Sequence, residues 1–368
     1  MAPRAVDGED ARLATSILTR SLRLRRGESV IIETWSDNVP FAETVVVQAR
    51  RLGIRPMVLY EGETSFFESQ RVAGVADAAA IATPELAALA TTDAYLYLPG
   101  PADLHRWAEL PEARRSAIDR WLTTWNRTAR DRAVRACYAF FATPSESSAR
   151  EFGVDLDAWR RETRTASALD PADLRRSARR IAQRLRTGRR VTVTHPNGTE
   201  LDLALAGRVP FVEDGSVDED DLRNGHNWTV LPGGFIVVAL DERVADGKFI
   251  ANRPSAHNRG LNAGIRWTFR GGRLTSYVSD DPTGVFAASY RAAGRERERP
   301  AILSVGLNPH LHHAPLQDDQ ILGMVSLFIG SNDNLRGRTR GPFRDYALLE
   351  GADVRVDGHP IVSAGEPV

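Results

Sequence analysis

The sequence predicts an N-terminal α/β domain followed by a second domain rich in β-strands. Up to about residue 145, short apolar and β-branched runs alternate with segments of helical periodicity, and strands separated by helices pair in parallel through right-handed crossovers. From about residue 190, short alternating strands are separated by turns rich in Gly, Asn and Asp, which is typical of antiparallel sheets. We therefore expect an open α/β sheet domain over residues 1–165, a connecting helix over 166–188 and a β-rich domain over 189–368.

The first domain is expected to alternate strands with helices. We expect strands at 29–34, 56–60, 94–98 and 134–141, and helices at 40–52, 84–91 and 109–132. In the first of these helices Phe41, Val45 and Ala49 recur at helical spacing, and Gly53 follows as a helix stop. Neither a dinucleotide-binding glycine motif nor a P-loop follows any of these strands, so no nucleotide site is indicated.

The connecting helix and the second domain follow from capping and turn signals. Asp170 can cap a helix over 171–186 that starts with Pro171 and places a row of apolar side chains on one face. Asn197-Gly198 between the runs 190–194 and 201–205 indicates a hairpin. Further strands are expected near 235–240, 264–269, 273–278, 324–329 and 353–356.

The charge balance and the single cysteine exclude several classes of protein. The chain has 368 residues with 48 Lys and Arg against 48 Asp and Glu, so it lacks the basic excess that binds nucleic acids or anionic membranes. Cys137 is the only cysteine, which excludes multi-cysteine metal sites. No apolar run reaches the ~20 residues of a membrane span, and residues 1–10 lack the apolar core of a signal peptide. We expect a cytoplasmic protein with no nucleic-acid or membrane partner.

Five short blocks in the second half occur in the order and spacing of a known superfamily. They are Leu231-Pro232-Gly233-Gly234, Gly306-Leu307-Asn308-Pro309, Asp318 to Ser326, Gly330-Ser331-Asn332, and Asp345. The blocks resemble those of the aminopeptidase T-type thermophilic metallo-aminopeptidases and of the related 2,5-dihydroxypyridine 5,6-dioxygenases. The resemblance implies an aminopeptidase T-like architecture of two domains with an interdomain cleft, and a homodimer.

The same resemblance implies six metal-ligand positions, most of which this chain has replaced. Carboxylates remain at Asp319 and Asp345. The other four positions hold Phe235, Ile302, Ser326 and Phe343. Two of these replacements also fall where the dioxygenases have their iron-binding histidines. Because two carboxylates alone hold a divalent metal weakly, we expect a degenerate metal site without a cofactor, in which the four replacing side chains contact the substrate.

Asp319, Asp345 and His226 are the candidates for acid/base catalysis. Two carboxylates that have lost a shared cation cannot both ionise easily, so one of them should have a raised pKa and could donate a proton. His226 lies shortly before the first block, near the cleft in the family layout, and imidazole titrates near neutrality; His257 is a weaker alternative. Arg344 is the candidate anion-binding charge, although the carboxylates and Arg344 could equally form a salt-bridged structural remnant.

Three functions therefore remain open. The first is a metal-free enzyme of specialised metabolism, which acts by acid/base chemistry on a small amide, peptide-like or heteroaromatic molecule. The second is a metal-dependent aminopeptidase, hydrolase or ring-cleaving dioxygenase, in which His310, His312 and Asp319 hold one rebuilt divalent Zn or Fe. The third is a non-catalytic protein that binds a peptide or a pathway intermediate.

Overall fold

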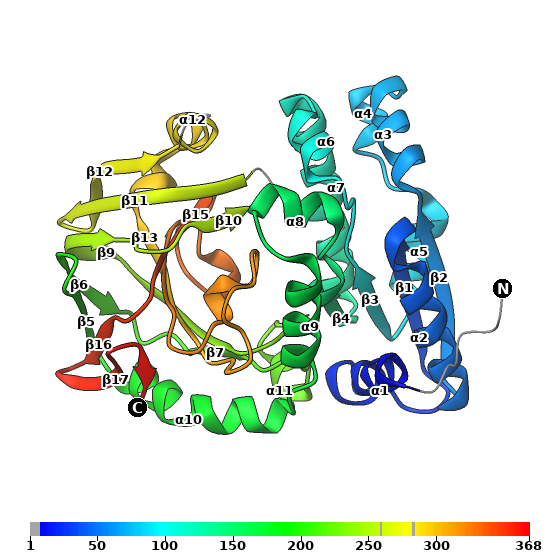
Figure 1. The fold of residues 1–368 in the computed structure, drawn as a ribbon, viewed down its shortest axis with the longest axis horizontal. Coiled ribbons are helices and arrows are strands. Elements are labelled where there is room, and N and C mark those ends of the chain that lie inside the picture. Colours follow the sequence, from blue (N-terminus) through cyan, green and yellow to red (C-terminus); the bar gives the residue numbers. More distant parts are fainter. Residues whose placement is uncertain (1–7, 258–259, 282–283) are drawn as a thin grey trace. The chain divides into compact units, whose positions relative to one another are not determined.

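The structure, a computed structural model, describes residues 8–257, 260–281 and 284–368, and the chain forms two compact units (Figure 1). Unit 1 contains the chain up to Pro171 together with Gly215–Gly233, and unit 2 contains Ala172–Asp214 and Gly234–Val368. The chain therefore returns once to unit 1 after it has begun unit 2. None of the helices in the described ranges has the length and apolar character needed to cross a membrane.

Unit 1 is built on a five-stranded parallel sheet with the strand order β2-β1-β3-β4-β8. Its strands are β1 (Ser29–Trp35), β2 (Arg55–Glu61), β3 (Ala94–Leu98), β4 (Arg135–Ala139) and β8 (Trp228–Leu231). The first four confirm the strands predicted from sequence. The fifth, β8, was not predicted, because its four residues are too few to show a periodicity; it pairs with β4 from a distant part of the chain.

Helices pack on both faces of this sheet. The α-helices of unit 1 are α1 (Glu9–Ser16), α2 (Val39–Arg51), α3 (Glu63–Val72), α4 (Val75–Ala78), α5 (Thr83–Thr91), α6 (Leu104–Glu109), α7 (Glu112–Asp131), α8 (Glu146–Phe152), α9 (Leu156–Ser167) and α11 (Glu219–Arg223). Shorter turns are η1 (Ile17–Ser21), η2 (Ser36–Asn38) and η3 (Phe140–Ala142). One core joins the sheet to α1 and α2 around Ile32 and Val45, and the other joins it to α5 and α7 through Leu89 and Trp125. The helix predicted to start at 109 begins later, after Pro111.

Unit 2 is dominated by a 13-stranded sheet in which neighbouring strands are antiparallel. Its strands are β5 (Arg190–His195), β6 (Thr199–Leu205), β7 (Phe211–Glu213), β9 (Phe235–Ile250), β10 (Ser255–His257), β11 (Gly260–Arg270), β12 (Arg273–Asp280), β13 (Pro300–Gly306), β14 (Val325–Gly330), β15 (Arg344–Leu349), β16 (Asp353–Val356), β17 (His359–Ser363) and β18 (Glu366–Pro367). The long strand β9 joins the parts, because its first half pairs with β7 and β13 and its second half pairs with β6 and β11.

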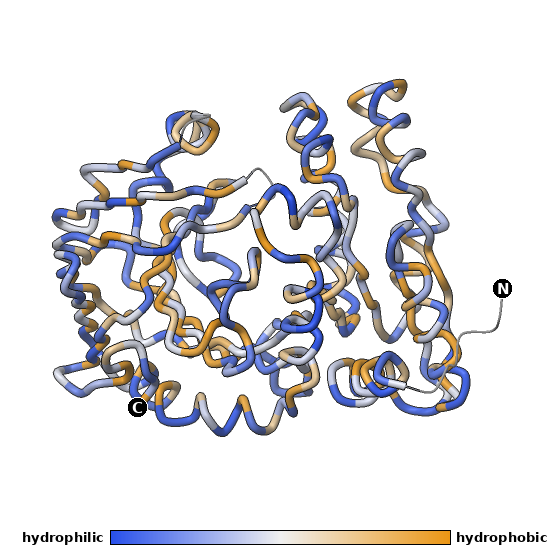
Figure 2. The backbone as a smooth tube through the Cα atoms, in the orientation of Figure 1, coloured by the Kyte–Doolittle hydropathy of each residue, from blue (hydrophilic) through white to orange (hydrophobic). Residues whose placement is uncertain are grey.

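Two helices and three short turns complete unit 2. They are α10 (Pro171–Thr187), α12 (Val285–Ala292), η4 (Arg295–Glu298), η5 (Asp318–Gln320) and η6 (Asp333–Leu335). Apolar residues recur along α10 between charged ones (Figure 2), and Ala178, Ile181 and Leu185 enter the main core with Val193, Leu203 and Trp267. The parallel α/β unit and the antiparallel β-rich unit confirm the predicted fold class.

Candidate functional site

Four neighbouring strands of unit 2, in the order β15-β14-β13-β9, carry five of the sequence-predicted site residues: Phe235, Ile302, Ser326, Arg344 and Asp345. Ser304 on β13 pairs with Ser326 on β14, and Ile302 pairs with Phe328. Because side chains alternate between the two faces of a strand, these four residues lie on one side of the sheet. We call this side of the four strands the motif face; the opposite side faces the main core through residues such as Leu303.

Apolar side chains fill much of the motif face. Ile302 is buried in a cluster that also includes Val237 and Leu335, and Phe235 and Phe328 pack against it. Phe235 and Ile302 are two of the replaced positions, so the structure brings these two into one apolar cluster. Side-chain atoms of this kind provide hydrophobic contacts and no ligand for a metal.

Buried polar atoms lie beside this apolar cluster. Ser304 and Ser326 are fully buried, and the Oγ atom of each has no hydrogen-bond partner among the residues that the structure describes. The same holds for both side-chain polar atoms of Gln317 and for Oε1 of Gln320, which come from the loop that contains η5. This loop packs close to the sheet, since a Cβ atom on Gly306 would lie 1.9 Å from the carbonyl oxygen of Ile321. Buried polar groups are normally paired, so this region offers hydrogen-bonding capacity to a bound molecule or to water.

Asp319 is the acidic group of this loop. Burial raises the pKa of Asp319 to about 6, and a backbone hydrogen bond offsets only part of that increase. Tyr346, which pairs with Phe328 and stacks on its ring at 5.3 Å between centroids, lies nearby. Burial raises the pKa of Tyr346 well above its usual value, and the charges of Asp319, Asp318 and Asp345 raise it further. A protonated Asp319 near neutral pH can donate a hydrogen bond or a proton.

Asp345 forms the centre of a polar network. Tyr277 donates its hydroxyl hydrogen to Asp345 Oδ2 at 2.8 Å, and the Asn262 amide approaches the same oxygen at 3.5 Å. On the other side, His257 Nε2 lies 3.6 Å from Asp345 Oδ1 and 3.1 Å from the Ser255 hydroxyl. Asp345 is only 4% exposed. The structure therefore brings together an imidazole, a phenol and a carboxylate that come from β10, β12 and β15.

The alternation of β15 separates Asp345 from its neighbour Tyr346. Ile329 pairs with Asp345 and Phe328 pairs with Tyr346, so Tyr346 lies on the motif face and Asp345 lies on the side of the main core. His257 reaches both, because its ring centroid is 4.8 Å from that of Tyr346 while its Nε2 contacts Asp345. His257 thus connects the two sides at the edge of the sheet.

Residues 8–287 match the sequence profile of the thermophilic metalloprotease (M29) family. The chain belongs to the M29 family. Its fold is similar to that of wild-type AmpT from Thermus thermophilus, with a TM-score of 0.78, 17% identity, and coverage of 98% of this chain and 99% of AmpT. It is also similar to 2,5-dihydroxypyridine dioxygenase from Pseudomonas putida KT2440, with a TM-score of 0.64, 15% identity and 98% coverage of both chains. No curated protein sequence matches the chain.

The M29 family name implies a metal ion, which side chains with oxygen, nitrogen or sulfur ligand atoms would have to hold. In the described ranges, no three His, Cys, Asp or Glu side chains come together in a group that could hold a metal ion. Phe235, Ile302 and Phe343 have no donor atoms, and the Ser326 hydroxyl is fully buried. The residues at these positions therefore do not fit the metal that the family name implies.

The other candidate residues of this M29 protein lie in different surroundings. Arg344 donates to the carbonyl oxygen of Ser331 at 2.9 Å and to Asn334 Oδ1 at 2.6 Å, and burial lowers the pKa of Arg344. Phe343 packs in the main core, with its ring centroid 6.0 Å from that of Tyr290. Arg344 thus supports the turn at 331–334, and Phe343 lies apart from the apolar cluster of Phe235 and Ile302.

The three candidate histidines outside this network lie in two places. His226 belongs to unit 1, where it follows α11 and donates its backbone N–H to the carbonyl oxygen of Asp221 at 2.9 Å. His310 and His312 lie in an exposed loop of unit 2. The N–H of His310 donates to Asn308 Oδ1 at 3.0 Å, and the carbonyl oxygen of His312 accepts from Arg253 at 3.0 Å. Backbone contacts therefore position both loops.

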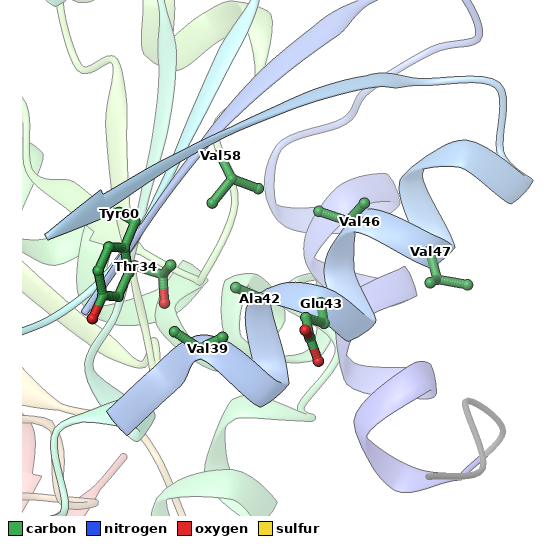
Figure 3. Close-up of a pocket in the computed structure, with 8 residues that line it drawn as sticks. All are labelled: Thr34, Val39, Ala42, Glu43, Val46, Val47, Val58 and Tyr60. Carbon is green, nitrogen blue, oxygen red and sulfur yellow. The ribbon is translucent and has the colours of Figure 1, made fainter. Parts of the chain in front are cut away.

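A separate apolar hollow occurs in unit 1, between α2 and the edge of the sheet at β2 (Figure 3). Its volume is about 700 Å³. The lining includes Val39, Val46, Val58 and Tyr60, with Glu43 at one side. None of these residues stands out in the sequence, because apolar side chains on an amphipathic helix and an edge strand look like ordinary core.

Several residues of the unit 2 network were also missed from sequence. Tyr277, Asn262 and Tyr346 come from strands whose patterns show only alternation. Ser304 had a detectable signal, because it is the one polar residue in the otherwise apolar run Pro300–Gly306. A hydroxyl in the middle of a fully buried strand indicates either a hydrogen-bond partner or a site.

Proposed function

We propose that this M29 protein is an enzyme that acts on a small amide, peptide-like or heteroaromatic molecule by acid/base chemistry. The observation that carries the proposal is the contact of His257 Nε2 with Asp345 Oδ1 at 3.6 Å, in a network that Tyr277 completes from the other carboxylate oxygen. The proposal uses no metal, because the side chains at the family positions offer too few donors.

Asp345 would orient His257 and stabilise its protonated form. A carboxylate that accepts hydrogen bonds from Tyr277 and Asn262 is held in place. Such a carboxylate favours an imidazolium beside it, so His257 can take a proton from a nucleophilic water and return it to a leaving group. The 3.6 Å separation is longer than a hydrogen bond, and catalytic contacts often tighten when substrate binds.

Asp319 would supply the second acid. A carboxyl group with a pKa of about 6 is partly protonated near neutral pH, so it can donate a proton to a substrate oxygen or nitrogen. The unpaired polar atoms of Ser304, Ser326 and Gln320 support a site for polar substrate groups here. Asp319 and His257 are linked through Tyr346, which Asp319 influences electrostatically and His257 contacts.

The remaining sequence-based roles belong to the same proposal. His226 stays a candidate acid or base, and Arg344 stays a candidate for substrate anions. Contacts with substrate are proposed for Phe235, Ile302, Ser326 and Phe343. A role in specialised metabolism, a homodimeric state and a cytoplasmic location are likewise proposals.

The test is a substrate screen with the full-length protein and matched variants. Aminoacyl p-nitroanilides, dipeptides and dihydroxypyridines are assayed for turnover. His257→Gln and Asp345→Asn are each expected to lower kcat by about 100-fold or more, with ligand affinity changed little, whereas the exposed His359→Gln should leave kcat unchanged. Equal turnover by wild type and both site variants would refute the proposed acid/base role.

M29 membership favours one alternative, a metal-dependent hydrolase. The same screen is therefore repeated after chelation and after addition of Zn²⁺ or Fe²⁺. Activity that disappears on chelation and returns with metal, while His310→Gln and His312→Gln abolish it, would support the rebuilt metal site and overturn the metal-free proposal. Activity unchanged by chelation supports the metal-free enzyme.

A further inference from the structure

One face of the unit 1 sheet carries a row of polar aromatic and acidic side chains. Glu33 on β1 pairs with Tyr97 on β3, and Tyr97 pairs with Tyr138 on β4. The three side chains therefore lie next to one another on the same face. Each is close to the carboxyl end of its strand, which is the end of a parallel sheet where ligands usually bind. All three are partly exposed, and Tyr97 and Tyr138 also pack against the core that joins the sheet to α5 and α7.

Aromatic side chains lie beside Glu33 on this face. Tyr95 donates its hydroxyl hydrogen to Glu33 Oε2. Tyr97 and Tyr138 meet edge to face at 5.8 Å between ring centroids, and Trp228 meets Tyr138 edge to face at 6.5 Å. The negative faces of such rings attract cations within about 6 Å.

Two further carboxylates, those of Glu61 and Glu85, act on Glu33. Burial raises the pKa of Glu33 to about 7, and the carboxylates of Glu85 and Glu61 raise it further, against the lowering effect of its hydrogen bond with Tyr95. Burial also raises the pKa of Glu61 and of Glu85. Among the described residues, none of these three glutamates forms an ion pair with an Arg, Lys or His. Three neighbouring carboxylates without a cation favour the binding of one from outside.

Trp35 provides an independent observation at the same place. Trp35 is 7% exposed, and its Nε1 atom is buried without a hydrogen-bond partner of normal geometry in the described part of the chain. The Trp35 side chain nevertheless lowers the pKa of both Glu33 and Tyr97, which places its N–H beside them. A buried indole N–H requires an acceptor, and an ionised Glu33 provides one. A cation that keeps Glu33 ionised would therefore satisfy Trp35 as well.

We propose that this face of unit 1 binds an organic ammonium group, with Glu33 as the counter-ion and Tyr97 and Tyr138 as the adjacent rings. An alkylammonium matches both the carboxylate and the aromatic rings, because its charge pairs with the carboxylate while its methyl or methylene groups contact the rings. A bare metal ion would use only the carboxylates, which do not form a group able to hold a metal in the described ranges. The site shares no residue with the Asp345 network of unit 2.

The test uses the full-length protein and tetramethylammonium chloride as the probe, with binding followed by calorimetry. Glu33→Gln keeps the side-chain shape and is expected to weaken binding at least fivefold, and Tyr138→Leu should weaken it by a similar factor. Glu151→Gln, an exposed glutamate of the same unit, should change the affinity less than twofold. Thermal unfolding of each variant checks that unit 1 remains folded.

Two further titrations separate the possible results. Tert-butyl alcohol, which has a similar shape and no charge, should bind at least tenfold more weakly than tetramethylammonium. Calcium chloride at equal ionic strength should not compete. Equal binding of the alcohol, or an unchanged affinity in Glu33→Gln, would overturn the proposal. Both results are independent of turnover, so the site can be confirmed even if the enzyme proposal fails.

Discussion

Ser304 and Ser326 lie directly opposite each other on β13 and β14, and the Oγ atom of each is buried without a hydrogen-bond partner among the described residues. Leaving a buried hydroxyl unpaired costs roughly 1–3 kcal/mol. The two hydroxyls therefore destabilise the chain in the absence of a bound molecule or water. Buried polar side chains that reduce stability are expected to serve binding.

The double substitution Ser304→Ala with Ser326→Ala should therefore stabilise the protein. We expect the free energy of unfolding to rise by about 1–2 kcal/mol, because two unsatisfied hydroxyls are replaced by methyl groups of nearly the same size. Urea denaturation measures the change. Ser145→Ala is the matched control, because Ser145 is also buried but caps α8 by accepting from the Ser148 N–H; its loss should lower stability by about 1 kcal/mol. A double variant less stable than wild type would show that the serines already have partners.

The elements of this fold were predictable because their signals are local. Apolar runs bounded by turns identified β1 and β3, and the cap at Asp170 with the periodicity that follows identified α10. Alternating strands after residue 190 identified the antiparallel unit. Neighbouring residues determine each of these elements, so tertiary packing did not change the conformation that the local sequence favours.

Site residues could be predicted from sequence only where they belong to the ordered sequence blocks that resemble the family. The blocks identified Asp319 and Asp345, but not the side of the sheet on which each lies, which the register of β15 decides. His226 ranked above His257 because it is nearer to a block in the sequence, whereas the contact of His257 with Asp345 depends on the pairing of β10 with β11 and on how β10 meets β15. The network of Tyr277 and Tyr346 arises in the same way from strands that are distant in sequence.

Glu242→Gln should destabilise unit 2 strongly, whereas Asp241→Asn should not. Glu242 is 7% exposed and accepts from the Arg208 guanidinium at 2.8 Å, the Asn332 amide at 2.9 Å and the Arg338 N–H at 2.7 Å. Removing its charge leaves the buried Arg208 guanidinium without a carboxylate partner, so we expect a loss of about 3 kcal/mol. Asp241 is paired with an exposed Arg243, and exposed pairs contribute little. Chemical denaturation of both variants measures the difference.

The effect of Glu242 should depend on pH in a defined direction. Burial alone would raise the pKa of Glu242, but Arg208 and the other donors lower it to about 2. Because the folded-state pKa is below the unfolded value, the stabilisation is complete above about pH 5 and is lost as pH falls toward 2. The difference in stability between wild type and Glu242→Gln should therefore shrink over this range. A difference that stays constant would mean that the charge of Glu242 does not stabilise its contacts with Arg208, Asn332 and Arg338.

The contribution of Asp319 to stability should depend on pH in the opposite direction to that of Glu242. Burial raises the pKa of Asp319 to about 6 in the folded protein, above its value of about 3.9 in an unfolded chain. Between these two pKa values, Asp319 holds a proton in the folded state that it has lost in the unfolded state. The contribution of Asp319 to stability therefore falls as pH rises from 4 to 6. Asp319→Asn removes this proton uptake, so the variant should match wild type near pH 4 and exceed its free energy of unfolding by about 2–3 kcal/mol at pH 7. Urea denaturation at four pH values tests this, with the exposed Asp77→Asn as the control. If the difference between Asp319→Asn and wild type is the same at every pH, Asp319 does not carry a raised pKa and cannot serve as the acid near neutral pH.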